Sequence, residues 1–405
     1  MYKLTVGDKT VVGCNEDAWR TTSKIWFENA QNPYEYGAGF TGSRQVSSNR
    51  FAPQSGMNEA GLVFSRLVAY YPQKSIAPQG KKITNEVSYL SEILHTCSTV
   101  EEVAEFINQY DHSIFIDDVF IYIDSSGKYL VVEPYELIVG NDANYVLSNF
   151  CPSITEQEQA NKLIRYKNGK EFLKTHDADT SLAFCTSLAD TMHVCRNRNG
   201  DGTLLTSIWD TKNRSVNLYF YHQYDSSVQF GLAEELAKGD HIINIPDLFP
   251  KNSEFERLAT YKTPFNTPEL RVSLVVLGGI LTFSAFLLCV FFFINKSSAI
   301  SFKTIALLSG MNVLLTSYLF VLATNSYIYY FDAPYTHYSS SLISASSYIP
   351  FLLLLTIAPV TSFTLKRFKS ANTKRRTKAL LISNNLIYLL LIVSFGYWGL
   401  YSVWN

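Results

Sequence analysis

Acidic residues are nearly absent from the last third of this 405-residue chain. Residues 271–405 contain one acid, Asp332, beside 10 basic residues, whereas residues 1–270 contain 34 acidic and 24 basic residues. The net charge of −1 is therefore the average of a +9 part and a −10 part. A single soluble domain does not show this asymmetry, so the sequence predicts two modules in two environments. The acidic balance of the first module argues against nucleic acid as a partner.

The chain also lacks the patterns that most often mark metal or nucleophile chemistry. It has no GxSxG, HExxH or P-loop motif. Its cysteines show no CxxC spacing and are too few for a disulfide scaffold, so we expect no zinc site and no cofactor. They are Cys14, Cys97, Cys151, Cys185, Cys195 and Cys289. His193 and His222 are isolated, and we expect each to be a hydrogen-bonded or surface histidine.

Four long runs without charge fill most of the last third. They cover residues 272–294, 305–323, 343–364 and 379–404. Each is long enough to cross a bilayer core of ~30 Å at ~1.5 Å per residue, and core helices of soluble proteins seldom stay uncharged for so long. We therefore expect four transmembrane helices. No ionisable residue lies inside the runs, which disfavours a transporter and favours an anchor in contact with membrane lipid.

The short loops between these runs predict an orientation. Lys296 and Lys303 lie between the first two runs, seven basic residues lie at 366–378, and residues 325–342 contain neither Lys nor Arg. Basic loops face the cytoplasm, so residues 1–270 are expected on the opposite side. We interpret the basic residues as a topology signal rather than a site for lipid headgroups. The first eight residues lack an apolar export signal, so we expect the native chain to start upstream.

The first module shows alternating strand and helix patterns. Strand pairs are expected at 2–6 with 10–14 and at 204–210 with 216–222, further strands at 119–124, 129–134 and 136–139, and helices at 86–97, 100–109, 156–174 and 181–192. Residues 246–270 contain four prolines and are expected to form a linker. This order predicts an α+β fold with stacked antiparallel sheets.

Two polar residues follow apolar strands at places where a catalytic group could lie. Asp17 comes shortly after residues 11–14, and a carboxylate there could orient a base or form a turn. Asn149 ends the apolar run 145–149, and its amide could face an oxyanion or close an Asx turn. The residues alone leave both alternatives open.

Four segments together resemble the motifs of one enzyme family, in the expected order. They are GCNEDAW at 13–19, GMNEAGL at 56–62, LSNFCP at 147–152 and TSIWDTKNRSVNLY at 206–219. Residues 1–245 are thereby similar to the choloylglycine hydrolase and penicillin V acylase family. The resemblance implies an N-terminal nucleophile (Ntn) hydrolase with an αββα sandwich that cleaves linear amide C–N bonds of small molecules. It divides the chain into an amidase domain at 1–245, a linker at 246–270 and a membrane domain at 271–405.

The resemblance also implies roles for particular residues. The family's nucleophile is an N-terminal cysteine whose own α-amine serves as base, and the ordinary pKa values of amine and thiol are close enough for this. By resemblance, Asp17 holds that amine, Asn149 stabilises the oxyanion and Arg165 matches a site arginine. The nucleophile is expected about three residues before Met1, so the chain as printed is expected to be inactive.

Two positions depart from the family pattern. Cys14 stands where bile-salt and penicillin members have a site arginine. Val68, which the resemblance makes a substrate-binding residue, lies near the position where those members have a side-chain oxyanion partner (Asn or Tyr), and the Val68 side chain cannot donate. Bile salts and penicillin are therefore poorly supported as substrates. A structural Cys14 is favoured over a nucleophilic one, because strand alternation places Cys14 and Asp17 on opposite faces. The alternative function is a non-catalytic Ntn-fold ectodomain that binds a ligand or anchors a partner.

Overall fold

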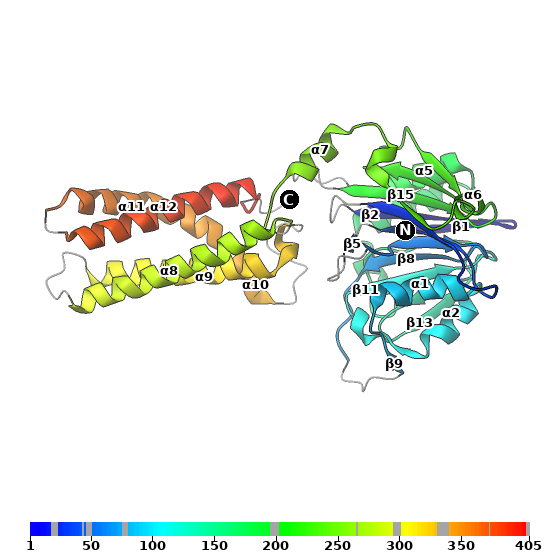
Figure 1. The fold of residues 1–405 in the computed structure, drawn as a ribbon, viewed down its shortest axis with the longest axis horizontal. Helices are drawn as coiled ribbons and strands as arrows, with labels where there is room; N and C mark the ends of the chain where they lie inside the picture. Colours follow the sequence, from blue (N-terminus) through cyan, green and yellow to red (C-terminus); the bar gives the residue numbers. More distant parts are fainter. Residues whose placement is uncertain are drawn as a thin grey trace. The chain divides into compact units, whose positions relative to one another are not determined.

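The structure is a computed structural model that describes residues 1–17, 23–42, 44–45, 51–74, 80–194, 202–264, 266–294, 301–329, 340–371 and 373–401. The chain forms two units, Met1–Thr260 and Tyr261–Asn405 (Figure 1). The first is a mixed α/β unit with antiparallel sheets, and the second is helical. The coarse prediction of an α and β module followed by four long apolar helices is thereby confirmed.

A six-stranded antiparallel sheet holds the start of the chain. Its order is β14 (Asn144–Val146), β1 (Tyr2–Val6), β2 (Lys9–Asp17), β15 (Thr203–Asp210), β16 (Ser215–Phe220) and β17 (Val228–Gly231). Gly7 has φ +61 in the turn between β1 and β2, a conformation that glycine adopts readily. Tyr2 pairs with Gly13 in the resulting hairpin. Both predicted strand pairs are present in this sheet.

An eight-stranded sheet lies in the same unit. Its order is β13 (Leu137–Gly140), β12 (Tyr129–Val132), β11 (Asp118–Ile123), β8 (Val63–Val68), β7 (Ser55–Asn58), β4 (Ala38–Gly42), β3 (Lys24–Glu28) and β18 (His241–Asn244). Two small pairs complete the strands: β5 (Arg44–Gln45) with β6 (Phe51–Ala52), and β9 (Lys81–Lys82) with β10 (Tyr110–Asp111). Apolar side chains of the two large sheets form one buried cluster, which includes Val12 and Trp209 from one sheet and Phe27 and Ile121 from the other.

Helices cover the remaining faces of the two sheets. Helices α1 (Glu86–Thr96) and α2 (Val100–Ile107) bury Leu90, Ile93 and Val103 against the eight-stranded sheet. A capping box between Thr99 and Glu102 fixes the start of α2. Helices α4 (Ile164–Thr175) and α5 (Leu182–Thr191) pack on the six-stranded sheet through a cluster that contains Leu188. Shorter helices are η1 (His112–Phe115), α3 (Gln157–Ala160), α6 (Leu232–Leu236) and η2 (Ile245–Leu248).

Two details differ from the sequence-based expectation. The helix expected at 156–174 is two helices, α3 and α4, because Leu163 between them adopts an extended conformation. The first unit also continues past residue 245 to Thr260, since helix α7 (Ser253–Thr260) packs on it. The ring of Phe255 in α7 is buried and lies 4.8 Å from the ring of Phe220.

The second unit consists mainly of long apolar helices. They are α8 (Pro268–Ile294), α9 (Phe302–Thr324), α10 (Ser341–Ser346), α11 (Ile349–Lys369) and α12 (Arg375–Tyr397), with η3 (Ser326–Tyr329) after α9. Four segments are long and apolar enough to cross a membrane: Pro268–Phe291, Phe302–Thr324, Ser341–Lys369 and Arg375–Tyr397. Buried polar contacts also join the helices, such as Ser284 to Asn384 at 2.7 Å. Lys296 and residues 402–404 of the predicted loop and fourth run lie outside the described residues.

Candidate active site

Asp17 lies at the end of β2 and forms an ion pair with α4. Its Oδ2 accepts a hydrogen bond from the Arg165 guanidinium at 2.7 Å, and its Oδ1 accepts one from the Thr203 hydroxyl at 3.2 Å. The Asp17 side chain is 17% exposed and that of Arg165 is 25% exposed. The structure thus brings two of the predicted site residues into direct contact, and the partial burial strengthens their attraction relative to a surface pair.

Asn149 and Val68 form a second contact. The Asn149 amide Nδ2 donates to the backbone carbonyl of Val68 at 2.9 Å. This contact fixes the direction of the amide, and the second N–H of Asn149 has no hydrogen-bond partner among the residues described. Val68 therefore positions the predicted oxyanion donor through its backbone, a role that needs no polar side chain.

The Met1 end of β1 connects these two pairs. Its α-amine donates to the Leu147 carbonyl at 3.0 Å, two residues before Asn149. Burial is the main cause that lowers the pKa of this amine to about 6; the nearby Cys14 and Asp17 oppose the shift, and the Arg165 charge adds to it. The amine therefore interacts electrostatically with the Asp17–Arg165 pair, and its hydrogen-bond partner Leu147 precedes Asn149 by two residues.

Cys14 lies on the inner side of β2, in the cluster between the sheets. Burial raises the pKa of its thiol to about 11, although the Ser65 hydroxyl opposes the shift. A thiol with this pKa remains protonated near neutral pH, which disfavours it as a nucleophile. Asp17 instead contacts α4, as expected from strand alternation. Trp19 of the first family-like segment and Cys195 lie outside the described residues.

Exposed apolar side chains lie beside these polar groups in the chain. Val68 is 44% exposed, Tyr70 57% and Ile164, directly before Arg165, 74%. Such side chains next to buried polar groups are typical of a site that binds a partly apolar ligand. Sequence reasoning missed them, because exposure of an apolar residue depends on tertiary contacts.

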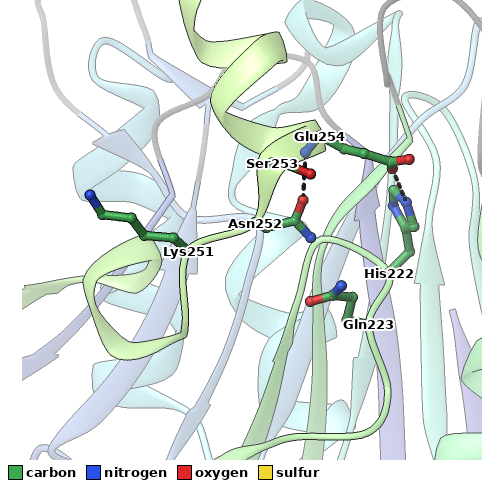
Figure 2. Close-up of a pocket in the computed structure, with 6 residues that line it drawn as sticks. All are labelled: His222, Gln223, Lys251, Asn252, Ser253 and Glu254. Carbon is green, nitrogen blue, oxygen red and sulfur yellow. Dashed lines mark hydrogen bonds and ion pairs between the residues drawn. The ribbon is translucent and has the colours of Figure 1, made fainter.

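A polar pocket lies next to Thr203, the residue whose hydroxyl donates to Asp17. It is lined by His222, Gln223, Lys251, Asn252, Ser253 and Glu254 (Figure 2). His222 donates from Nδ1 to the Thr203 carbonyl at 3.2 Å, and its Nε2 faces Glu254 at 3.6 Å. His193 Nδ1 donates to the Asp190 backbone carbonyl, and the His193 ring stacks on that of His222 with the ring centroids 5.8 Å apart. Both histidines are hydrogen-bonded, as expected, and His222 is one residue removed from Asp17 through Thr203.

Sequence reasoning also missed Glu16. Its carboxyl points between the sheets, where Oε1 accepts from the Thr41 hydroxyl at 2.6 Å. Burial raises the pKa of this carboxyl to about 7, while hydrogen bonds from Thr41 and Ser55 oppose the shift. Strand alternation around Asp17 was the available signal, since it places Glu16 on the inner face beside Cys14. Within the described ranges, no group of three or more His, Cys, Asp or Glu residues is placed to hold a metal ion.

Among the comparisons with known proteins, only the search of solved structures found similar proteins. No protein-family model matches the chain, and no curated protein matches it. Two variants of the conjugated bile acid hydrolase from Clostridium perfringens align with 16% and 15% identity, each with a TM-score of 0.44, over 62% of this chain and 97% of theirs. Penicillin V acylase from Agrobacterium tumefaciens aligns with 14% identity and a TM-score of 0.44, over 60% of this chain and 89% of its own.

Proposed function

We propose that the first unit is an Ntn-type hydrolase of linear amide C–N bonds with an αββα layer order. The observation that carries the proposal is the Asp17–Arg165 ion pair beside the Met1 α-amine, which donates to the Leu147 carbonyl two residues before Asn149. A carboxylate can hold an α-amine there, and an amide can stabilise an oxyanion. The family resemblance of four sequence segments supports the same activity.

The register of the β1–β2 hairpin suggests where the nucleophile belongs. Tyr2 pairs with Gly13, so the same antiparallel register places the residue opposite Asp17 three positions before Met1. Directly opposite residues share a face of the sheet, which would bring an N-terminal cysteine at that position to the Asp17 carboxylate. We propose that processing exposes this cysteine.

The proposed reaction has two halves. The cysteine α-amine takes the thiol proton, the sulfur bonds to the amide carbon, and Asn149 donates to the resulting oxyanion. The C–N bond then breaks as the α-ammonium gives its proton to the leaving amine. Water, deprotonated by the same α-amine, attacks the thioester, and the C–S bond breaks to release the carboxylic acid and the thiol. An oxyanion donor of this kind typically lowers the activation barrier by ~3 kcal/mol.

The exposed apolar residues Val68, Tyr70 and Ile164 support a small-molecule amide with an apolar part as substrate. The four apolar helices support a membrane anchor in contact with lipid. The basic residues at the end of α11 and the start of α12 favour an orientation in which the amidase unit lies outside the cytoplasm.

The test restores the proposed nucleophile. The full-length chain is produced with Cys-Thr-Thr ahead of Met1, the cysteine being exposed by a site-specific protease, and is incubated with a panel of N-acyl amino acids and acyl p-nitroanilides. Release of amine is expected, and an otherwise identical chain with Ala-Thr-Thr should release none. If the cysteine form hydrolyses no member of the panel, the catalytic proposal fails and a ligand-binding role for the unit is favoured.

A further inference from the structure

A β-bulge interrupts the pairing of β2 and β15 directly beside Asp17. Thr203 pairs with Asp17 and Leu205 pairs with Glu16, so Leu204 is the extra residue on β15. A bulge bends its strand and changes the direction of the neighbouring side chains, and bulges are frequent next to active sites. Here the Thr203 hydroxyl donates to Asp17 Oδ1 at 3.2 Å. The irregularity in β15 thus lies where a side chain of this strand meets the carboxylate of the candidate site.

The Thr203 side chain is fully buried, at 0% exposure. Its hydroxyl accepts a hydrogen bond from the Val194 backbone N–H at 3.0 Å while it donates to Asp17. A hydroxyl carries a single hydrogen, and the bond from Val194 leaves that hydrogen available for the carboxylate. Valine has nearly the same shape and would fill the same space without either hydrogen bond. Packing alone therefore does not explain why this position carries a hydroxyl.

Three further hydrogen bonds hold the backbone of the bulge. The Thr203 N–H donates to the Val194 carbonyl at 2.7 Å, and the Tyr221 N–H donates to the Leu204 carbonyl at 2.8 Å. The imidazole of His222 donates to the Thr203 carbonyl at 3.2 Å. Tyr221 and His222 have φ values of 53° and 48°, in the left-handed region that is unfavourable for residues other than glycine. Such strain persists where the surrounding structure enforces it, and it is concentrated at functional sites.

Asp17 is thereby held at both of its carboxylate oxygens. Arg165 binds Oδ2 at 2.7 Å and Thr203 binds Oδ1 at 3.2 Å, and the two donors belong to different elements. Two such contacts fix the plane of a carboxylate more firmly than one ion pair does. A carboxylate that holds a catalytic amine needs a fixed direction, since a misplacement of about 1 Å can reduce a rate ~100-fold.

We propose that Thr203 is a positioning residue, which directs the Asp17 carboxylate toward the α-amine of the N-terminal cysteine. It acts through Asp17 rather than on the substrate. A second cation at this place would compete with the α-ammonium for the charge of the carboxylate, whereas a neutral hydroxyl orients the carboxylate without adding charge. This inference rests on the proposed amide hydrolysis.

The experiment uses the full-length chain with the N-terminal cysteine and the acyl p-nitroanilide that it cleaves fastest. Thr203→Val removes the hydroxyl and keeps the shape of the side chain. It is expected to lower kcat at least about tenfold and to change KM less than about twofold, because Asp17 holds the catalytic amine rather than the substrate. Thr203→Ser keeps the donor and should retain kcat within about threefold of wild type. If Thr203→Val does not fold, Thr203→Ala carries the same comparison.

The pH profile separates positioning from a general loss of stability. A carboxylate beside an ammonium group raises the pKa of the amine, so the amine loses its proton at lower pH when Asp17 is less well directed. The acid limb of kcat/KM reports this pKa, and it is expected to move to lower pH in Thr203→Val. Thr206→Val is the matched control, because Thr206 lies on the same strand, is 1% exposed and donates across to Asn15 of β2.

The inference requires both changes in Thr203→Val, the fall in kcat and the displaced acid limb, with neither in Thr206→Val. An acid limb that stays at the wild-type pH overturns it whatever happens to kcat, and so does an unchanged kcat. Equal effects in Thr203→Val and Thr206→Val overturn it as well. In each of these cases the amidase proposal stands, because the wild-type chain still cleaves its substrate.

Failure of hydrolysis is distinguished by the reactivity of the cysteine. If no p-nitroanilide is cleaved, the amidase proposal fails, and alkylation of the N-terminal cysteine by iodoacetamide is then followed against pH by mass spectrometry of the N-terminal peptide. Alkylation requires the thiolate, whose formation responds to the charge of the neighbouring α-amine. A midpoint that moves in Thr203→Val but not in Thr203→Ser or Thr206→Val supports the role of Thr203. Identical midpoints overturn it.

Discussion

At the scale of single residues, the Asp17–Arg165 pair joins strand β2 to helix α4. Its 2.7 Å contact joins a strand end to a helix 148 positions away in the sequence. We expect a double-mutant cycle of Asp17→Asn and Arg165→Gln to give a coupling free energy of about 1–2 kcal/mol for unfolding. A hydrogen bond between charged, partly buried groups stabilises a fold more than an ion pair on the surface does. The coupling free energy is measured by urea unfolding, with the hydrogen exchange of β2 amides as the probe.

The exposed Lys128–Glu101 pair is the matched control for this cycle. Its side chains are 50% and 55% exposed, so its coupling should lie near 0–0.5 kcal/mol. Equal coupling in both pairs would show that the partial burial of Asp17 and Arg165 adds nothing to their interaction.

Glu16 should make stability depend on pH. Its pKa is about 7 in the folded chain and ~4.3 in an unfolded one. Between these values the folded state keeps a proton that the unfolded state has lost, so the free energy of unfolding falls as pH rises from about 4 to 7, by roughly 3–4 kcal/mol. Gln does not titrate, so the free energy of unfolding of Glu16→Gln should not show this fall with pH. Unfolding measured at pH 4, 6 and 8 should show the variant gaining on wild type as pH rises; a constant difference would refute the raised pKa.

At the scale of elements, α7 decides where the first unit ends. Phe255 anchors it, since its ring lies 4.8 Å from Phe220 and 5.6 Å from Tyr221. Phe255→Ala should remove about 3 kcal/mol of local packing and lower amide protection in 253–260 about a hundredfold, as measured by hydrogen exchange. Glu256→Ala, on an exposed position of the same helix, should leave protection within a fewfold of wild type. Unchanged protection in Phe255→Ala would return this segment to the linker.

The elements also show how far a sequence alone can predict this fold. Regular patterns predicted the β1–β2 and β15–β16 hairpins and helices α1, α2 and α5, because local period and turn residues determine them. The short strands β3, β4 and β18 were missed, since partners far apart in the chain stabilise them. The buried hydroxyls of Thr41, Ser55 and Ser65 have the same origin, because they align only through strand register, which no local pattern encodes.

Some residues of the candidate site were predicted from the sequence, and others could be found only from the structure. Family-like segments predicted Asp17 and Asn149 as site residues, and the family resemblance added Arg165, which the structure places in contact with Asp17. The role of Val68 required coordinates, because it acts through a backbone carbonyl. Glu16 required them too: its inward direction follows from alternation, but its hydrogen bonds with Thr41 and Ser55 depend on other strands.

At the scale of the whole molecule, the charge asymmetry predicts which side of a membrane each part occupies. The second unit carries basic residues at the end of α11 and the start of α12, and its four apolar helices contain few charges. Three spans separate the first unit from the loop after α11, and this odd number places the loop on the side opposite the first unit. We therefore expect Ser125→Cys, in an exposed turn of the first unit, to react with a membrane-impermeant maleimide on intact cells, whereas Ala371→Cys should react only after permeabilisation.

The native cysteines make this labelling experiment feasible. Among the described residues, Cys14, Cys97, Cys151 and Cys185 are buried in the first unit and Cys289 lies within an apolar helix. Cys195 lies outside the described residues, so the chain without an added cysteine is labelled in parallel and sets the background. Labelling of Ala371→Cys but not Ser125→Cys on intact cells would reverse the orientation and place the amidase unit in the cytoplasm. Labelling of both on intact cells would contradict three spans between Ser125 and Ala371. The same result decides whether the proposed amidase site would face external or cytoplasmic amides.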